Sequence, residues 1–144
     1  MRAQILLSGA AGFIVAAIGL LHAIYTFQDI RRPRYLAPVD ATVKSAMEAT
    51  KVRITRGQSS VWDVWLGVNL THSYGLLVVG VAAICLPSMV RGEYLTIVLA
   101  AFALLVIVYL ATAMRFFFNV PAALLAVATL LMLGALAVQL AAGR

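Results

Sequence analysis

The sequence predicts an all-α integral membrane protein, in which four transmembrane helices form a bundle and a basic, partly helical loop joins helices one and two. Hydrophobic residues make up 64% of the 144 residues and charged residues only 11%, with a mean hydropathy of +1.02. Soluble domains carry about 25% charged residues. A soluble core of this size could not enclose so much apolar surface. Four apolar runs approach or exceed the roughly 20 residues that cross a bilayer, and we expect one domain over residues 1–144.

The first span is expected at about residues 5–27. It follows Arg2 as the apolar part of a signal peptide would, but it is longer and ends in bulky residues instead of an A-x-A cleavage site. We therefore expect this segment to be retained as a helix. Ser8, Gly12 and Ala16 recur every four residues, which predicts a smooth ridge for the close approach of another helix.

Residues 28–60 form the only long polar segment and hold seven of the eleven Lys and Arg residues. Asp40 is a suitable N-cap for an amphipathic helix at about 41–56, and Gly57 suits its C-terminal cap. Such a helix would lie among lipid head groups with its basic side chains toward phosphate; a solvated loop helix is the alternative. The basic charge predicts contact with membrane lipids, and no nucleic-acid motif is present.

The second span is expected at about 61–87, because Ser60 and Asp63 have the spacing of a capping box. Polar residues continue into this apolar helix and share one face with apolar neighbours at helical spacing. An unpaired polar group in hydrocarbon costs several kcal/mol, so this face must lie against protein or water. The residues that share it are Trp65, Asn69, His72, Ser73 and Leu76.

The third span is expected at about 94–118 and the fourth at about 121–141. Asn119 can cap the fourth helix, and Pro121 fits its first turn. The fourth span is rich in alanine and almost without polar side chains, which favours close packing over chemistry. The only cysteine, Cys85, excludes an intrachain disulfide and a cysteine-cluster metal site, and we expect a buried thiol there.

The polar side chains of spans one to three lie near the loop ends of those spans. His22 and His72 are expected at similar depth, which makes them the candidate catalytic residues. A structural interpretation stays open: Asn69, Ser73 and Thr112 could serve only as hydrogen bonds between helices, and Arg115 could reach the interface or pair with Asp63. The predicted ligand-binding cluster is His22, Tyr25, Asp63, Trp65, Asn69, His72, Ser73, Tyr109, Thr112 and Arg115.

Three functions are compatible with this cluster. The first is a scaffold or binding protein that holds a lipid-like molecule or a partner membrane protein. The second is an intramembrane enzyme or redox protein that uses His22 and His72, for example as a proton carrier. The third is a small transporter acting as a dimer, since four spans without repeats would need a second copy in a homo-oligomer.

No cofactor and no metal site are predicted. Two histidines on facing helices at similar depth would suit bis-histidine haem ligation, so haem remains the alternative. A zinc or copper site would need further ligands beyond the two imidazoles. No nucleophile motif, phosphate-binding loop or carboxylate pair points to a hydrolase or kinase.

Two resemblances accompany these patterns. The run W-x-x-W-x-G-x-N-x-x-H-S-x-G over residues 62–75, with His22-x-x-Tyr25-Thr26, resembles a family of small, uncharacterised bacterial integral membrane proteins with four helices. This resemblance covers most of residues 15–85 and implies the four-helix fold. It also marks His22, Asn69 and His72 as candidate functional residues. The layout, including Phe27-Gln28-Asp29 at the end of span one, is also distantly similar to the four-helix scaffold of late sterol biosynthesis.

The distribution of basic residues predicts an orientation in a bacterial inner membrane. Four spans place both termini on one side and the long loop on the other. The loop side holds eight Lys and Arg residues, Arg115 among them, and the terminal side holds three: Arg2, Arg91 and Arg144. The positive-inside rule therefore places the loop in the cytoplasm and both termini outside.

Overall fold

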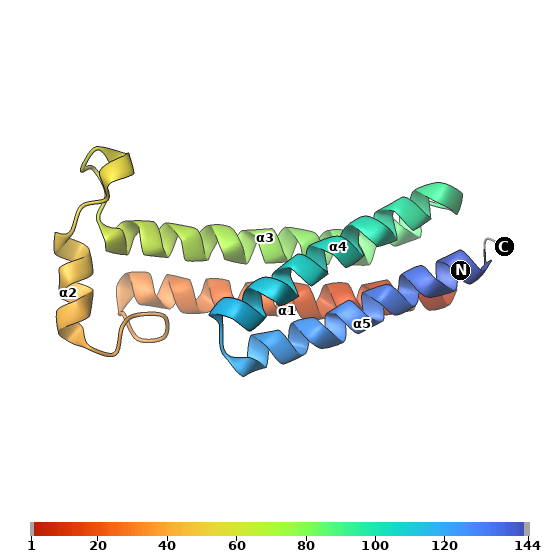
Figure 1. Cartoon of the computed structure of the whole chain (residues 1–144), viewed down its shortest axis with the longest axis horizontal. Coiled ribbons are helices and arrows are strands. Elements are labelled where there is room, and N and C mark those ends of the chain that lie inside the picture. Colours follow the sequence, from red (N-terminus) through yellow and green to blue (C-terminus); the bar gives the residue numbers. More distant parts are fainter. Residues whose placement is uncertain (1, 143–144) are drawn as a thin grey trace. The chain divides into compact units, whose positions relative to one another are not determined.

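The computed structural model describes residues 2–142, and within them it is all-helical (Figure 1). Four long helices, α1 (Arg2–Arg31), α3 (Val61–Met89), α4 (Gly92–Phe116) and α5 (Asn119–Ala142), are long and apolar enough to cross a membrane. A short helix, α2 (Ala41–Ala49), and a 3₁₀ turn, η1 (Arg53–Thr55), lie between α1 and α3. The predicted fold class is therefore confirmed. Arg144, counted above for the orientation, lies outside the described residues.

The start of α3 is fixed by the predicted capping box. The Ser60 amide donates to the Asp63 carboxylate at 2.8 Å, and the Asp63 amide donates to Ser60 Oγ at 3.1 Å. These reciprocal bonds satisfy amide groups that a helix start leaves without partners. The helix ends close to the predicted end near Pro87, since α3 continues through Pro87 to Met89. A proline in the last turn removes only one helical hydrogen bond, so the helix can run past it.

The loop helix is shorter than the predicted 41–56. Its start is as expected, since the Asp40 carboxylate accepts from the Thr42 amide and hydroxyl, which lowers the pKa of Asp40 below that of an ordinary aspartate. It ends at Ala49 because the chain that follows pairs with the segment before α3: the Val61 amide donates to the Thr50 carbonyl at 2.9 Å. Gly57 is left-handed, as a cap requires, but it follows η1.

By its contacts the described part of the chain divides into two compact units, the first made of residues 2–18 and 76–142. In this unit α4 and α5 lie side by side (Figure 1). One hydrophobic core includes Leu76, Leu99 and Met132, each almost fully buried. The beginning of α1 meets α3 closely at Gly12 and Gly80: a Cβ built on Gly12 would lie 2.6 Å from the Gly80 carbonyl oxygen. The ridge predicted on α1 therefore serves a close helix contact here.

The second unit is made of residues 19–75 and contains α2, η1 and the adjoining halves of α1 and α3. Here α2 runs across the ends of the two half-helices instead of along them (Figure 1). The Lys44 ammonium of α2 lies 5.5 Å from the centre of the Trp62 ring at the start of α3, which is within cation–π range. The Trp65 indole donates to the Leu36 carbonyl at 3.2 Å and ties the loop to α3.

A buried carboxylate, whose role the sequence pattern did not predict, organises the turn after α1. Asp29 is 0% exposed and accepts from three backbone amides: those of Arg34 and Tyr35 at 2.8 Å and that of Leu36 at 2.6 Å. The Tyr35 ring, held in this turn, stacks on Tyr25 of α1 with 4.7 Å between ring centres. A single side chain thus replaces the backbone partners that this turn lacks.

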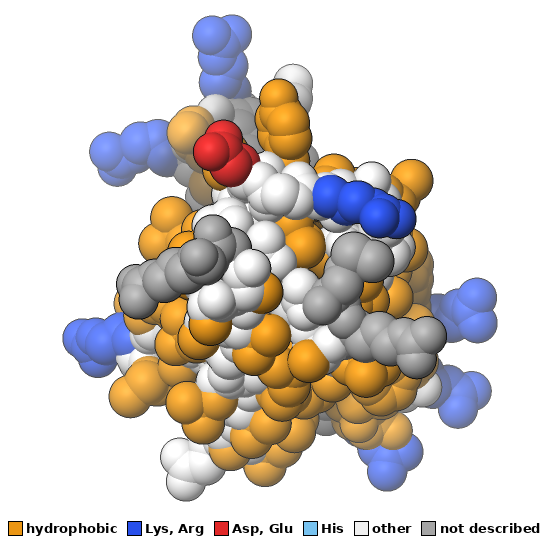
Figure 2. Space-filling view, turned by 90° about the vertical axis from the view of Figure 1, so that its right-hand side faces the viewer, with side chains coloured by type: hydrophobic (Ala, Val, Ile, Leu, Met, Phe, Trp, Pro, Cys, Tyr) orange, Lys and Arg blue, Asp and Glu red, His pale blue; other side chains and the backbone are white. Residues whose placement is uncertain are grey.

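Large apolar side chains stay exposed along the long helices. Leu6 and Phe13 of α1, Val78 of α3 and Leu104 of α4 are examples. Most of the described surface visible in Figure 2 is hydrophobic. Cys85 is also exposed, so the buried thiol expected from its apolar neighbours is wrong. Such a surface would be unfavourable in water and is suited to acyl chains.

Candidate functional site

His22 of α1 and His72 of α3 lie against each other in the second unit. Their ring centres are 5.4 Å apart and the ring planes meet at 80°, an edge-to-face contact. His22 Nε2 lies 2.8 Å from Asn69 Oδ1, one turn before His72 on α3. Both imidazoles are partly buried and Asn69 is buried. The structure therefore brings together the three residues on which the sequence argument depended, and we call them the His–Asn–His cluster.

The orientation of the Asn69 amide determines which ring nitrogen of His22 carries the hydrogen. Asn69 Nδ2 donates to the Trp65 carbonyl at 2.7 Å, one turn earlier on the same helix. The amide oxygen of Asn69 therefore faces His22, and an amide oxygen can only accept. His22 must then carry a hydrogen on Nε2, which leaves Nδ1 as the ring acceptor when the imidazole is neutral. Trp65 thus acts on the cluster through its backbone and not through its ring.

Replacing Asn69 by leucine is expected to remove the preference of His22 for the Nε2–H tautomer. The His22 N–H would lose its acceptor inside the protein, and an unsatisfied buried donor costs about 1–3 kcal/mol. The measurement is the side-chain ¹⁵N NMR spectrum of His22, where we expect the Nε2–H pattern in the native protein and a mixture in the variant. Ser73→Ala is the matched control, because Ser73 is buried on the same face and bonds only the Asn69 carbonyl. An unchanged His22 spectrum in Asn69→Leu would contradict the assignment.

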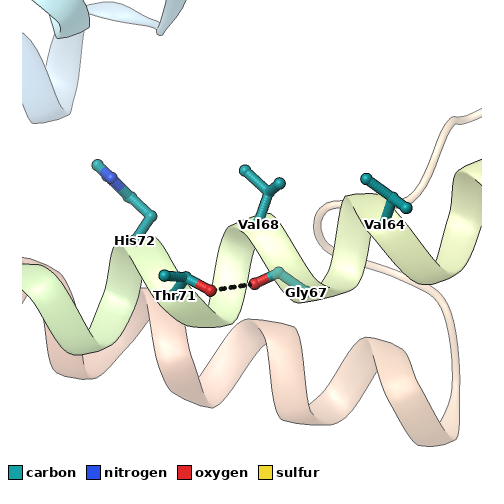
Figure 3. Close-up of a pocket in the computed structure, with 5 residues that line it drawn as sticks. All are labelled: Val64, Gly67, Val68, Thr71 and His72. Atoms are coloured by element: carbon teal, nitrogen blue, oxygen red, sulfur yellow. Dashed lines mark hydrogen bonds between the residues drawn. The ribbon is translucent and has the colours of Figure 1, made fainter. Parts of the chain in front are cut away.

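A shallow hollow of about 560 Å³ opens on α3 beside the cluster (Figure 3). In Figure 3 the side chains of Val64, Val68 and His72 project from the same side of the helix, and Gly67 leaves the space between turns unfilled. A Cβ on Gly67 would meet no heavy atom within 4 Å. Thr71, which also lines the hollow, donates its hydroxyl to the Gly67 carbonyl at 2.7 Å. The hollow is therefore apolar along its length, with an imidazole at one end.

Sequence reasoning missed four of the five residues that line this hollow. The available signal was the spacing of a glycine among small apolar residues one turn before a histidine. That spacing occurs in many helices, and it indicates a hollow only once the positions of the neighbouring side chains are known. The missed residues are Val64, Gly67, Val68 and Thr71.

Three other predicted site residues of the second unit have local structural contacts. Asp63 caps α3 and is exposed. Tyr25 stacks on the loop, and the hydroxyl of Ser73 donates to the Asn69 carbonyl at 2.7 Å within α3. Ser73 therefore does not bond between helices, which was the structural alternative; a serine hydroxyl at this spacing satisfies its own helix.

The remaining predicted site residues, Tyr109, Thr112 and Arg115, belong to the first unit. Thr112 donates to the Val108 carbonyl at 2.9 Å, again within its own helix. The Arg115 guanidinium is exposed and lies 5.5 Å from the centre of the Phe116 ring. Their participation in a site with His22 and His72 stays a prediction.

The cluster consists of two imidazoles and one amide, and the amide is bonded both to His22 and to the Trp65 carbonyl. Among residues 2–142, no group of three or more His, Cys, Asp or Glu side chains is placed to hold a metal ion. A haem or metal ligated by His22 through Nε2 would have to displace the Asn69 amide. The arrangement is better suited to exchanging hydrogen bonds or a proton with a polar group that reaches His72.

These helices define the class of the protein. Four candidate membrane-spanning helices indicate a multi-pass helical membrane protein. Comparisons with models of known protein families, with curated proteins and with solved structures found no match to this chain.

Proposed function

We propose that this membrane protein binds a lipid-like molecule, with the apolar part of that molecule in the hollow on α3 and its polar part at His72. One observation carries the proposal: His72 lines the hollow and also contacts the ring of His22, which Asn69 holds in place. Sites for small ligands are commonly apolar with a few well-placed polar groups. An amphiphile would match both the apolar lining of the hollow and the polar group at its end.

The physical chemistry of the hollow favours an amphiphile over a soluble metabolite. Of the five lining residues only His72 is ionisable, and the hydroxyl of Thr71 is already engaged within the helix. A highly charged ligand would therefore lose its hydration without gaining partners. An acyl or isoprenoid chain would cover Val64 and Val68, and one hydrogen bond to His72 would fix its depth.

Filling the hollow is the direct test of this proposal. Gly67→Leu adds a side chain where the structure has open space, so binding is expected to fall at least about tenfold without loss of folding, since a blocked pocket loses most of its contact energy. The measurement is native mass spectrometry of the protein purified from membranes, with lipid analysis of what remains bound. Gly9→Leu is the matched control, because Gly9 on α1 also has no heavy atom within 4 Å of a Cβ.

Two results would overturn the proposal. One is equal lipid retention by the native protein, Gly67→Leu and His72→Leu. The other is co-purification of a stoichiometric protein at this face instead of a lipid, which would make the hollow a contact surface for a partner subunit.

The edge-to-face histidine contact favours one second candidate, an intramembrane enzyme that uses acid–base chemistry. His22 and His72 at 5.4 Å between ring centres could pass a proton to or from a bound lipid. Turnover that is abolished in His72→Ala, even at lipid concentrations that saturate the weakened binding of that variant, would establish this function. Binding without any turnover in the native protein would exclude it and leave the binding role.

The localisation that we propose is a bacterial inner membrane, with the 28–60 loop in the cytoplasm and both termini outside. The support is the excess of basic residues on the loop side, eight against three. Labelling intact cells with a membrane-impermeant maleimide tests it: a cysteine at Gln58 in a Cys85→Ser background should be protected. Rapid labelling there would reverse the orientation.

A further inference from the structure

The acidic groups of residues 28–60, from the last turn of α1 to the start of α3, all have hydrogen-bond partners within that segment. Asp29 is enclosed by three backbone amides. Asp40 caps α2 through Thr42. Glu48 pairs with Lys44 one turn away on α2. No carboxylate of residues 28–60 is therefore left to neutralise the other basic side chains of that segment, and Lys51 has a carboxylate neighbour outside it, Asp63 of α3.

Six basic side chains remain exposed after these pairings. They lie in two short runs, one at the end of α1 and just after it and one around η1. The Arg34 guanidinium lies over the Tyr35 ring at 5.4 Å. Clusters of four to eight Lys and Arg residues beside a membrane-spanning helix are typical of contact with anionic lipid head groups. The six are Arg31, Arg32, Arg34, Lys51, Arg53 and Arg56.

Two large apolar side chains of the same loop face outward without a packing partner. Ile54, in η1 between Arg53 and Arg56, is 90% exposed, and Val39, just before α2, is fully exposed. An exposed isoleucine between two arginines is unfavourable in water, but it suits a head-group region, where apolar tips enter the acyl boundary and basic groups meet phosphate. The transverse course of α2 is the course of a helix that lies along a membrane surface (Figure 1).

We propose that the six basic residues named above, with Ile54 and Val39, form a surface that binds anionic phospholipid head groups of the leaflet in which the protein is inserted. The arginines and Lys51 contact lipid phosphates, and the two apolar side chains enter the acyl boundary. This surface is independent of the hollow on α3, and neither Ile54 nor Val39 lines that hollow.

The test is a fluorescent probe at position 54 in the full-length protein. NBD is attached to Ile54→Cys in a Cys85→Ser background, and the protein is placed in nanodiscs of phosphatidylcholine with or without phosphatidylglycerol. We expect a blue-shifted emission and reduced iodide quenching only with phosphatidylglycerol, reversed by high salt because such contacts are screened. Removing Arg53 and Arg56 together should lower the inserted fraction, by about fivefold for each arginine.

Two controls make the result specific. NBD at Met89, an exposed residue at the turn between α3 and α4, should respond little to phosphatidylglycerol, because only Arg91 lies in that turn. Arg53→Lys with Arg56→Lys keeps the charge and should retain the blue shift, which separates loss of charge from loss of folding. Identical spectra for position 54 in both lipids, or a shift in neutral lipid that high salt leaves unchanged, would overturn the proposal.

Discussion

Replacing Gly80 by alanine is expected to destabilise the protein by about 1–3 kcal/mol, the usual cost of forcing an extra group into a packed interior. A Cβ at Gly80 would lie 2.6 Å from the Gly12 carbonyl oxygen and closer still to the backbone nitrogen of Ala16. Both atoms are backbone, so neither can rotate away, and α1 and α3 would have to separate where they meet. Thermal unfolding in detergent and the chemical shifts of residues 8–16 measure the effect.

Two other glycines serve as controls, because there the change in stability on replacement by alanine should have the opposite sign. Gly9 and Gly67 also lie inside long helices, but nothing stands within 4 Å of a Cβ on either. Alanine is the better helix former by about 0.5–1 kcal/mol, so Gly9→Ala and Gly67→Ala should be neutral or stabilising. If Gly80→Ala behaved like these two controls, the close contact at Gly12 and Gly80 would be refuted.

Replacing Asp29 by alanine should cost about 4 kcal/mol or more and loosen the turn that follows α1. Hydrogen bonds to a charged group contribute about 1.5–3 kcal/mol each, and Asp29 accepts three from backbone amides that have no other acceptor in the described turn. Amide hydrogen exchange at Arg34, Tyr35 and Leu36 is the specific measurement, and all three should lose protection. The Tyr25–Tyr35 stack should be lost with the turn.

Asp29→Asn and Asp40→Ala are the control variants for the effect of Asp29→Ala on hydrogen exchange. Asparagine keeps one acceptor oxygen, so only part of the protection should be lost. Asp40 caps α2 at an exposed site, and its removal should affect α2 alone. Unchanged exchange at residues 34–36 in Asp29→Ala would mean that the backbone holds this turn without the carboxylate.

The parts of the fold that depend on local chemistry could be predicted from the sequence. Apolar runs of sufficient length located the four long helices, and Ser60 with Asp63 identified the start of α3. The register of α3 placed Asn69 and Ser73 on the buried side, but Trp65, assigned to the same face, is 41% exposed. Helical periodicity predicts which side chains share a face of the helix. Whether each of them is buried depends on the neighbouring segments that cover that face.

The features that depend on distant segments could not be predicted. The loop helix stops early because Thr50, just after it, shares a hydrogen bond with Val61 at the start of α3. Asp29 was noted as part of an exit motif, but its three amide partners come from a turn whose path no local pattern specifies. The contact of His22 with His72 followed from matched depth, whereas the tautomer of His22 required the orientation of Asn69.

Photo-crosslinking tests the central claim, a lipid site at His72, most directly. A lipid with a diazirine in its acyl chain is added to the native protein in nanodiscs, and the adducts are mapped by mass spectrometry. The account predicts adducts concentrated at Val64, Val68 and Thr71 and lost in Gly67→Leu. Adducts distributed evenly over exposed residues of α4 and α5, with the same yield in Gly67→Leu, would contradict it.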